Sequence, residues 1–207
     1  MSTMPVAESV IERDQITGIV LCGGRGSRLD NQDKPLLTVG NNTIIARIEK
    51  RLKPQVSEVL ISGSRNIAIY ESYGNRVVVD QDIEKGPLVG LVSTFPAVKS
   101  EWVLTTPGDV PFIPTNLIEL LSDVALNKGV AVPIVENVRQ NLCMLLNREC
   151  REQLSQFYTE GGLAVKHWLD SIPHCHVELS TYAKEFFNIN TPSDLERAEL
   201  LSRELNA

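Results

Sequence analysis

Glycines and basic side chains gather in one short segment near the start of the chain. The glycines are Gly23, Gly24 and Gly26, and the cations are Arg25, Arg28 and Lys34. Glycine lets the backbone turn tightly and brings its N–H groups close to a ligand, and bare N–H groups beside cations suit a polyphosphate. We expect a phosphate-binding loop here. The alternative is a plain glycine-rich turn after a strand.

The spacing of these residues excludes two common phosphate motifs. The P-loop pattern needs a glycine followed by Lys-Ser or Lys-Thr, which is missing here. The dinucleotide-binding pattern G-x-G-x-x-G begins at Gly24 and Gly26 but meets Leu29 where its third glycine belongs. The segment is therefore a phosphate loop of another kind.

An acidic residue, Asp109, follows an apolar run at residues 102–106 that is typical of a buried strand. A carboxylate that faces a phosphate loop repels the ligand unless a cation lies between them. Mg²⁺ prefers one or two carboxylates together with substrate phosphate oxygens. We expect Asp109 to bind Mg²⁺. The alternative is a turn residue that hydrogen-bonds its own backbone.

Other polar residues follow further expected strands. They are Ser62, at the end of the run 56–62, and Asp80, after the run 76–79. Ligands of an open parallel sheet bind beyond the carboxyl ends of its strands, so these side chains should meet the phosphate loop. Asp80 could contact a nucleotide or a metal, or simply end a strand, and Asp82 is a weaker candidate.

These features together favour phosphoryl or nucleotidyl transfer, because no Ser-His-Asp or Cys-His arrangement accompanies them. Such chemistry needs no covalent nucleophile, since alignment and charge neutralisation supply most of the rate. A phosphate-bearing acceptor would attack the α-phosphate of a nucleotide, and pyrophosphate would leave. Lys34 and Arg28 would then balance the charge of the triphosphate. The alternative for each is a surface cation that serves solubility.

Strands and helices alternate along the chain, which predicts a three-layer α/β fold with a mainly parallel central sheet flanked by helices. The expected strands are residues 18–21, 56–62, 76–79, 102–106, 130–135 and 140–146, with a short one around Val177. The expected helices are 43–52, 67–73, 88–98, 116–128, 149–158, 162–169 and 193–205. Thr43 and Thr115 should cap two of them, and Gly129 should end one.

Size and composition set further bounds. We expect a flexible lead-in at residues 1–14 and a single domain at 15–207, since no linker-like segment divides the chain. A net charge of −6 argues against a nucleic-acid partner. The absence of a long apolar run argues against a membrane span, and four scattered cysteines favour a cytoplasmic protein with reduced thiols. The run His174-Cys175-His176 is a weak metal candidate.

The motifs resemble those of a known family. Leu21-Cys22-Gly23-Gly24, Arg28 and Asp33-Lys34 are similar to the opening pattern of nucleotidyltransferases, which adopt a Rossmann-like fold. Three further segments narrow the resemblance to the molybdenum cofactor guanylyltransferases. They are Gly86-Pro87-Leu88-Val89-Gly90, Gly108-Asp109-Val110-Pro111-Phe112-Ile113-Pro114 and Phe187-Asn188-Ile189-Asn190-Thr191-Pro192-Ser193-Asp194-Leu195.

This resemblance implies GMP transfer from GTP to molybdenum-molybdopterin, with Mg²⁺ and release of pyrophosphate. Molybdoenzyme apoproteins or their chaperones would be further partners. By position, residues of the loop and of the strand ends would bind GTP, Asp109 would also bind Mg²⁺, and two asparagines would lie near the site. These residues are Leu21, Cys22, Gly23, Gly24, Lys34, Ser62, Asp80, Asp109, Asn188 and Asn190.

The chain departs from the family pattern at a few positions. Ser62 stands where the family often has an asparagine that contacts the nucleotide, Cys22 replaces an alanine, and Leu29-Asp30 replaces Met-Gly. Two alternatives therefore stay open. One is a relative that uses CTP or a sugar phosphate, and the other is a non-catalytic module that binds and delivers the cofactor.

Overall fold

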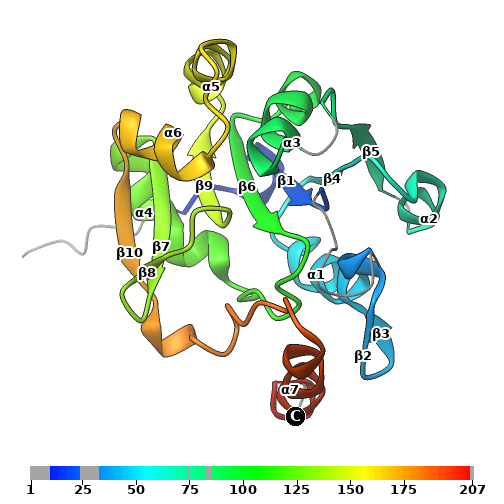
Figure 1. Ribbon diagram of the computed structural model, residues 1–207. Coiled ribbons are helices and arrows are strands. Elements are labelled where there is room, and N and C mark those ends of the chain that lie inside the picture. Colours follow the sequence, from blue (N-terminus) through cyan, green and yellow to red (C-terminus); the bar gives the residue numbers. More distant parts are fainter. Residues whose placement is uncertain (1–9, 24–32, 74, 83–84, 206–207) are drawn as a thin grey trace, which may run out of the picture.

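The computed structural model describes residues 10–23, 33–73, 75–82 and 85–205. Within these residues an eight-stranded sheet has the order β10-β7-β9-β6-β1-β4-β5, and β8 pairs with β7 (Figure 1). The strands are β1 (Ile16–Leu21), β4 (Glu58–Gly63), β5 (Arg76–Val79), β6 (Trp102–Pro107), β7 (Val130–Val135), β8 (Val138–Arg139), β9 (Met144–Asn147) and β10 (Cys175–Glu178). A small hairpin, β2 (Thr38–Val39) with β3 (Asn42–Thr43), lies apart.

The sheet is mainly parallel, as the alternation of strands and helices predicts. β6, β1, β4 and β5 are parallel neighbours, and β10 is parallel to β7. β9 runs antiparallel between β6 and β7, and β8 is antiparallel to β7. The carboxyl ends of β6, β1, β4 and β5 therefore meet at one edge of the sheet.

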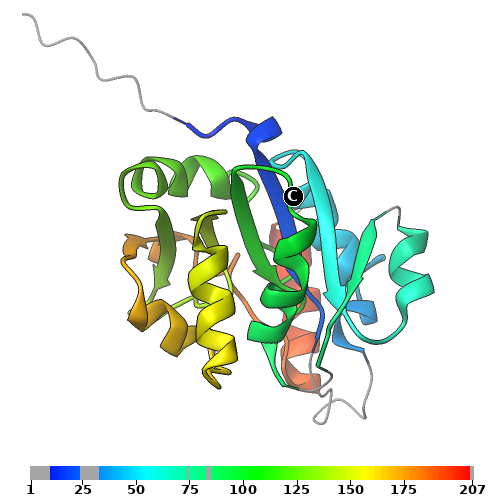
Figure 2. The same ribbon diagram turned by 90° about the horizontal axis from the view of Figure 1, so that it is seen from above.

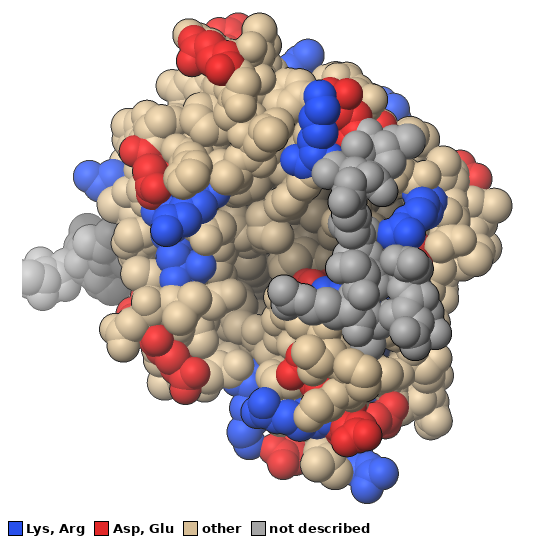
Figure 3. Space-filling view, viewed as in Figure 1, with Lys and Arg blue, Asp and Glu red and all other residues tan. Residues whose placement is uncertain are grey.

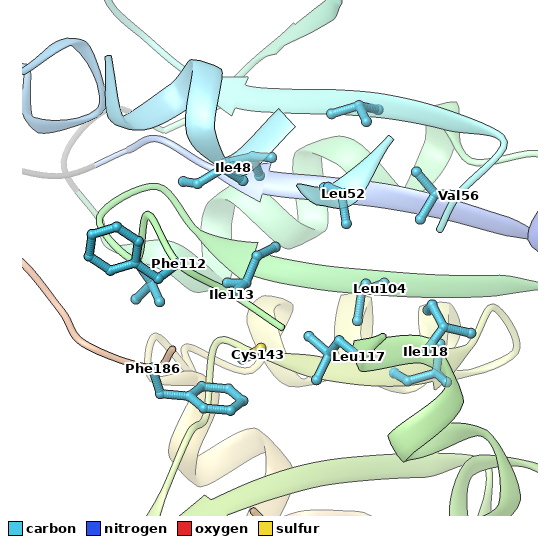
Figure 4. Packing of buried hydrophobic residues seen from close by; sticks show 14 of the residues in the cluster. Ile48, Leu52, Val56, Leu104, Phe112, Ile113, Leu117, Ile118, Cys143 and Phe186 are labelled. Atoms are coloured by element: carbon cyan, nitrogen blue, oxygen red, sulfur yellow. The ribbon is translucent and has the colours of Figure 1, made fainter. Parts of the chain in front are cut away.

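Helices cover both faces of the sheet (Figures 1 and 2). The helices are α1 (Ile44–Leu52), α2 (Ile67–Ser72), α3 (Pro87–Thr94), α4 (Leu117–Lys128), α5 (Cys150–Thr159), α6 (Val165–Ser171) and α7 (Pro192–Glu204). Buried side chains of α1, α4 and α7 form one core with alternate residues of the strands, part of which Figure 4 shows. Those of α3, α5 and α6 form the second core on the opposite face.

Alternation along the central strand explains these two cores. Ile16 and Val20 of β1 belong to the first core, whereas Ile19 and Leu21 belong to the second. Successive side chains of a strand point to opposite faces, so a strand that is buried at every position lies between two helical layers. All six residues of β1 are buried. This confirms the three-layer architecture.

Three local predictions are wrong. Asn116, not Thr115, is the N-cap of α4, and no side-chain cap forms; instead Gln55 Oε1 accepts a hydrogen bond from the Ile118 amide at 3.1 Å. The expected strand 140–146 begins only at Met144. The expected helix 88–98 ends as α-helix at Thr94, and a short 3-10 turn (Phe95–Ala97) that contains Pro96 follows.

The local signals at two other helix ends are confirmed. Thr43 caps α1 with its hydroxyl, which accepts a hydrogen bond from the Ala46 amide, and Gly129 ends α4 at φ 79°. In the predicted lead-in, residues 1–9 lie outside the described part of the chain. Ile11 is buried, and its amide donates to Ser122 Oγ at 3.1 Å.

Candidate functional site

Backbone hydrogen bonds tie the ends of four neighbouring strands together beyond their regular ladders. The amide of Gly108 donates to Leu21 O at 2.9 Å, Cys22 N to Ser62 O at 2.8 Å, and Asp80 N to Gly63 O at 3.4 Å. In Figure 3 the molecule is hollowed near the middle of the face toward which the arrowheads of β6 and β1 point in Figure 1. The predicted convergence of strand ends is therefore present in the fold.

The close approach of these segments depends on glycine at position 108. A Cβ atom there would lie 2.9 Å from Pro35 Cγ, 3.0 Å from Leu21 O and 3.1 Å from Cys22 Sγ. Contacts this short would force the neighbouring atoms to move apart. Gly108 thus lets the turn after β6, which carries Asp109, pack directly against the segment that follows β1.

Lys34 connects two segments that are distant in the sequence. Its Nζ donates to Asn190 Oδ1 at 2.6 Å and lies 3.5 Å from Asp109 Oδ2. The lysine sits in a short 3-10 turn (Lys34–Leu36) that begins after Asp33. The amide of Ile189 donates to the Asp109 carbonyl at 2.9 Å, so the 189–190 segment is docked on the turn after β6. The structure therefore brings Lys34, Asp109 and Asn190 together.

A helix cap holds Asn190 in place. Asp194 Oδ2 accepts hydrogen bonds from the amides of Asn190 at 3.0 Å and Thr191 at 2.9 Å, while Thr191 Oγ1 accepts from the Asp194 amide. This reciprocal capping box fixes the start of α7. The prediction from sequence gave Asp194 no role. The Thr-x-x-Asp spacing was the available signal.

The two carboxylate oxygens of Asp109 have different surroundings. Oδ2 faces Lys34, whereas Oδ1 is buried and has no hydrogen-bond partner among the described residues. Burial raises the pKa of this carboxyl, and the nearby Lys34 ammonium and a hydrogen bond from the residue's own backbone amide partly offset the rise, so the turn role named as the alternative is also present. A buried acceptor without a partner is costly and uncommon, which makes Oδ1 a candidate ligand for a cation or for a donor of a bound ligand.

Asp80 forms a second polar cluster, at the end of β5. Ser62 Oγ donates to Asp80 Oδ1 at 2.6 Å. A Cβ atom on Gly23 would lie 2.8 Å from Asp80 Oδ2, so the first glycine of the loop lies against this carboxylate. Burial raises the pKa of Asp80, and the Ser62 hydrogen bond partly offsets the rise. Gly23, Ser62 and Asp80 are thus also brought together.

Cys22 lies between the two clusters but is not suited to nucleophilic attack. Burial, and next the negative charge of Asp33, raise the pKa of its thiol well above the ordinary value. The thiolate is the reactive form of cysteine, so a protonated thiol is inert at neutral pH. Leu21 places its side chain in the core and offers only its backbone to the site.

Some predicted residues are not joined to these clusters. Gly24 and Arg28 lie outside the described residues, so their roles stay predictions. Asn188 is exposed and makes no hydrogen bond with another described site residue. Asp82 pairs instead with Lys85 at 3.3 Å and accepts a hydrogen bond from the Tyr158 hydroxyl.

The His174-Cys175-His176 run shows no sign of a metal centre. His174 Nε2 lies 3.1 Å from Arg139 Nη1, and its Nδ1 lies 3.1 Å from Ile172 O, so both ring nitrogens have protein partners. No group of three or more His, Cys, Asp or Glu side chains in the described part of the chain could hold a metal ion. Among the described residues, a metal at Asp109 would therefore find few protein ligands, which suits an ion that takes its other ligands from a substrate and water.

The chain is similar in sequence to known proteins. Residues 18–176 match the model of the MobA-like NTP transferase domain. A molybdenum cofactor guanylyltransferase of Ralstonia nicotianae is 34% identical over 200 residues, covering 91% of this chain and 98% of its own. One of Shewanella pealeana is 31% identical over 196 residues, covering 93% and 98%.

Solved structures show the same fold at lower identity. Molybdopterin-guanine dinucleotide biosynthesis protein A from Archaeoglobus fulgidus superposes with a TM-score of 0.75 at 18% identity, covering 91% of this chain and 99% of its own. The 2-C-methyl-D-erythritol 4-phosphate cytidylyltransferase of Thermus thermophilus gives 0.71 at 18% identity, covering 89% and 98%. None of the described helices is long and apolar enough to span a membrane.

Proposed function

Because the chain belongs to the MobA-like NTP transferases, and among them to the molybdenum cofactor guanylyltransferase family, we propose that it transfers GMP from GTP to molybdenum-molybdopterin. The observation that carries the proposal is the Asp109 carboxylate, which has Lys34 on one oxygen and a buried second oxygen without a partner among the described residues. This pairing of a cation with a free hard ligand suits a metal-bridged triphosphate.

The reaction forms one bond and breaks one. A phosphate oxygen of the acceptor attacks the α-phosphorus of GTP, and the bond from that phosphorus to the bridging oxygen of the β-phosphate breaks. Pyrophosphate leaves with the electron pair. Lys34 compensates the charge of the phosphates, and Asn190 holds the lysine ammonium by a 2.6 Å hydrogen bond. No protein nucleophile takes part, which agrees with the protonated thiol of Cys22.

Mg²⁺ is the metal that we propose for this site. Asp109 Oδ1 would hold it, because that oxygen is a hard donor without a partner among the described residues. When bound, Mg²⁺ would neutralise charge on the triphosphate and on the leaving pyrophosphate. The small number of protein ligands fits a metal that takes its other ligands from phosphates and water.

The test is pyrophosphate release by the purified protein with Mg²⁺, molybdenum-molybdopterin and each of GTP, CTP, ATP and UTP. We expect release with GTP and formation of the guanine dinucleotide. Preference for CTP would instead identify a cytidylyl transferase. Tight GTP binding without pyrophosphate release would identify a delivery module. A thermal-shift series with the same nucleotides checks binding separately, because only a ligand of the folded state raises the midpoint.

A further inference from the structure

The hydroxyl of Ser62 is enclosed by protein rather than open to the site. Ser62 is 1% exposed, at the end of β4. Its Oγ donates to Asp80 Oδ1 at 2.6 Å, and this carboxylate is itself only half-buried. A side chain that is enclosed in this way can act on a ligand only through the group to which it is hydrogen-bonded.

We propose that Ser62 is a positioning residue that fixes the Asp80 carboxylate so that its free oxygen accepts a hydrogen bond from the nucleoside part of GTP. This inference rests on the proposed function. It replaces the expectation that Ser62 contacts the nucleotide directly, as the asparagine often found at that position in the family would.

Gly90 provides the space that the hydroxyl occupies. It lies in α3, and a Cβ atom at this position would be 2.3 Å from Ser62 Oγ. Side-chain atoms do not approach so closely, so any larger residue at position 90 displaces the hydroxyl from Asp80. A helical glycine is otherwise less favourable than alanine. The contact with Ser62 gives a physical reason for glycine at this position.

The second oxygen of Asp80 points toward the loop. A Cβ atom on Gly23 would lie 2.8 Å from Asp80 Oδ2, and Gly23 itself is exposed. Glycine at position 23 thus leaves this oxygen uncovered on the side of the phosphate loop. With Oδ1 engaged by Ser62, Oδ2 is the atom that remains for a ligand.

The charge environment selects what Asp80 can accept. Among the described residues no cation pairs with this carboxylate, whereas Asp109 has Lys34 at 3.5 Å. An unpaired carboxylate repels phosphate oxygens and attracts N–H and O–H donors. A guanosine nucleotide offers such donors at the N1–H and amino group of the base and at the ribose hydroxyls.

Four proteins test the inference: wild type, Ser62→Ala, Gly90→Ala and the double variant. We expect Ser62→Ala and Gly90→Ala each to raise the KM for GTP by about tenfold and to change kcat by less than about twofold. The double variant should be close to Ser62→Ala alone, because the severe clash at position 90 is with Ser62 Oγ, whereas the Leu21 Cδ2 atom at 3.1 Å needs to move by only a few tenths of an ångström. Additive losses in the double variant would overturn the inference.

Nucleotide analogues identify which group of the nucleotide donates a hydrogen bond to Asp80. N1-methyl-GTP lacks the N1–H donor, ITP lacks the amino group of guanine, and 2′-deoxy-GTP and 3′-deoxy-GTP each lack one ribose hydroxyl. We expect wild type to bind one of these analogues more weakly than GTP by about tenfold, and this penalty should vanish in Ser62→Ala. If Ser62→Ala keeps every analogue penalty of wild type, Ser62 does not act through Asp80.

Two controls separate this inference from other failures. Ser122→Ala removes another fully buried hydroxyl, in α4, and should leave the KM for GTP unchanged. Calorimetric dissociation constants for GTP are measured beside turnover, so the comparison of variants does not depend on the transfer reaction. If wild type does not turn over GTP, the proposed function is contradicted. If wild type and Ser62→Ala bind GTP with equal affinity, only the role of Ser62 is contradicted.

Discussion

Two carboxylates at the same edge of the sheet occupy different chemical environments. Asp109 follows β6 and lies 3.5 Å from the ammonium of Lys34. Asp80 follows β5 and takes a 2.6 Å hydrogen bond from the neutral hydroxyl of Ser62. Burial raises the pKa of both groups, but a cation offsets the rise only at Asp109.

Because of this difference, the two ends of the sheet edge suit different parts of a bound nucleotide. The β6 end combines a cation with a free carboxylate oxygen, which suits metal and phosphates. The β5 end presents a carboxylate without a cation, which suits uncharged donors. β1 lies between them in the sheet and leads into the glycine-rich segment. GTP should therefore lie with its phosphates at Asp109 and its nucleoside at Asp80.

The largest effect is expected from Asp109→Asn. This change should lower the rate of GMP transfer by about a hundredfold or more, because it removes a charge that acts on the transition state. Pyrophosphate release at saturating GTP and Mg²⁺ measures it. Asp123→Asn, an exposed carboxylate on α4, is the matched control. Near wild-type turnover by Asp109→Asn would exclude this residue from the mechanism.

A smaller effect is expected from Lys34→Ala, which removes the cation of the β6 end. GTP affinity should fall by roughly tenfold to a hundredfold, because losing one hydrogen bond to a charged group raises the dissociation constant by about this factor. Titration calorimetry with GTP and Mg²⁺ gives the affinity. Lys128→Ala at the exposed end of α4 serves as the control. Equal affinity of Lys34→Ala and wild type would refute the phosphate assignment.

Asn190→Ala tests the support of that lysine. The variant removes the 2.6 Å hydrogen bond to Lys34 Nζ but keeps the cation, so a loss of about fivefold in kcat/KM is expected. Combining it with Lys34→Ala should add nothing further, because both changes act on one contact. Asn127→Ala, on the exposed side of α4, is the control. Full additivity in the double variant would separate Asn190 from Lys34.

The smallest effect concerns stability, at the β5 end. Because burial raises the pKa of Asp80 above its ordinary value of 3.8, the folded state favours the protonated carboxyl. That contribution is complete below pH 3.8 and is lost as pH rises through the folded pKa, so the ionised carboxylate destabilises the fold at neutral pH.

Asp80→Asn should therefore raise the melting temperature at about pH 7.5, and the gain should shrink as pH approaches the ordinary carboxyl pKa. Asparagine keeps an acceptor for the Ser62 hydroxyl, so the comparison isolates the charge. Thermal melts over this pH range measure the difference. A gain of the same size at both ends of the range would show that ionisation of Asp80 is not its cause.

The sequence predicts the features that are set by neighbouring residues. The apolar run of β1 identifies a buried central strand, and Thr43 three residues before Ala46 identifies a helix cap. The polar residue after each parallel strand predicts the edge at which the site forms, because the topology of such sheets fixes that edge. Family motifs add the identity of the ligands.

Contacts across long stretches of chain could not be predicted in this way. Gln55, not Thr115, satisfies the first turn of α4, because tertiary packing brings a distant side chain to the Ile118 amide. The Lys34–Asn190 hydrogen bond joins residues 156 positions apart. The burial of Ser62, which removes it from direct contact with a ligand, depends on α3 packing above β4.

The most direct test of the account is a crystal structure with a non-hydrolysable GTP analogue and Mn²⁺ in place of Mg²⁺. The anomalous signal locates the metal independently of the model of the protein. We expect a peak within coordination distance of Asp109 Oδ1, phosphates beside Lys34, and the nucleoside at Asp80. A metal bound away from Asp109, or a nucleoside at the β6 end with phosphates toward Asp80, would contradict the account.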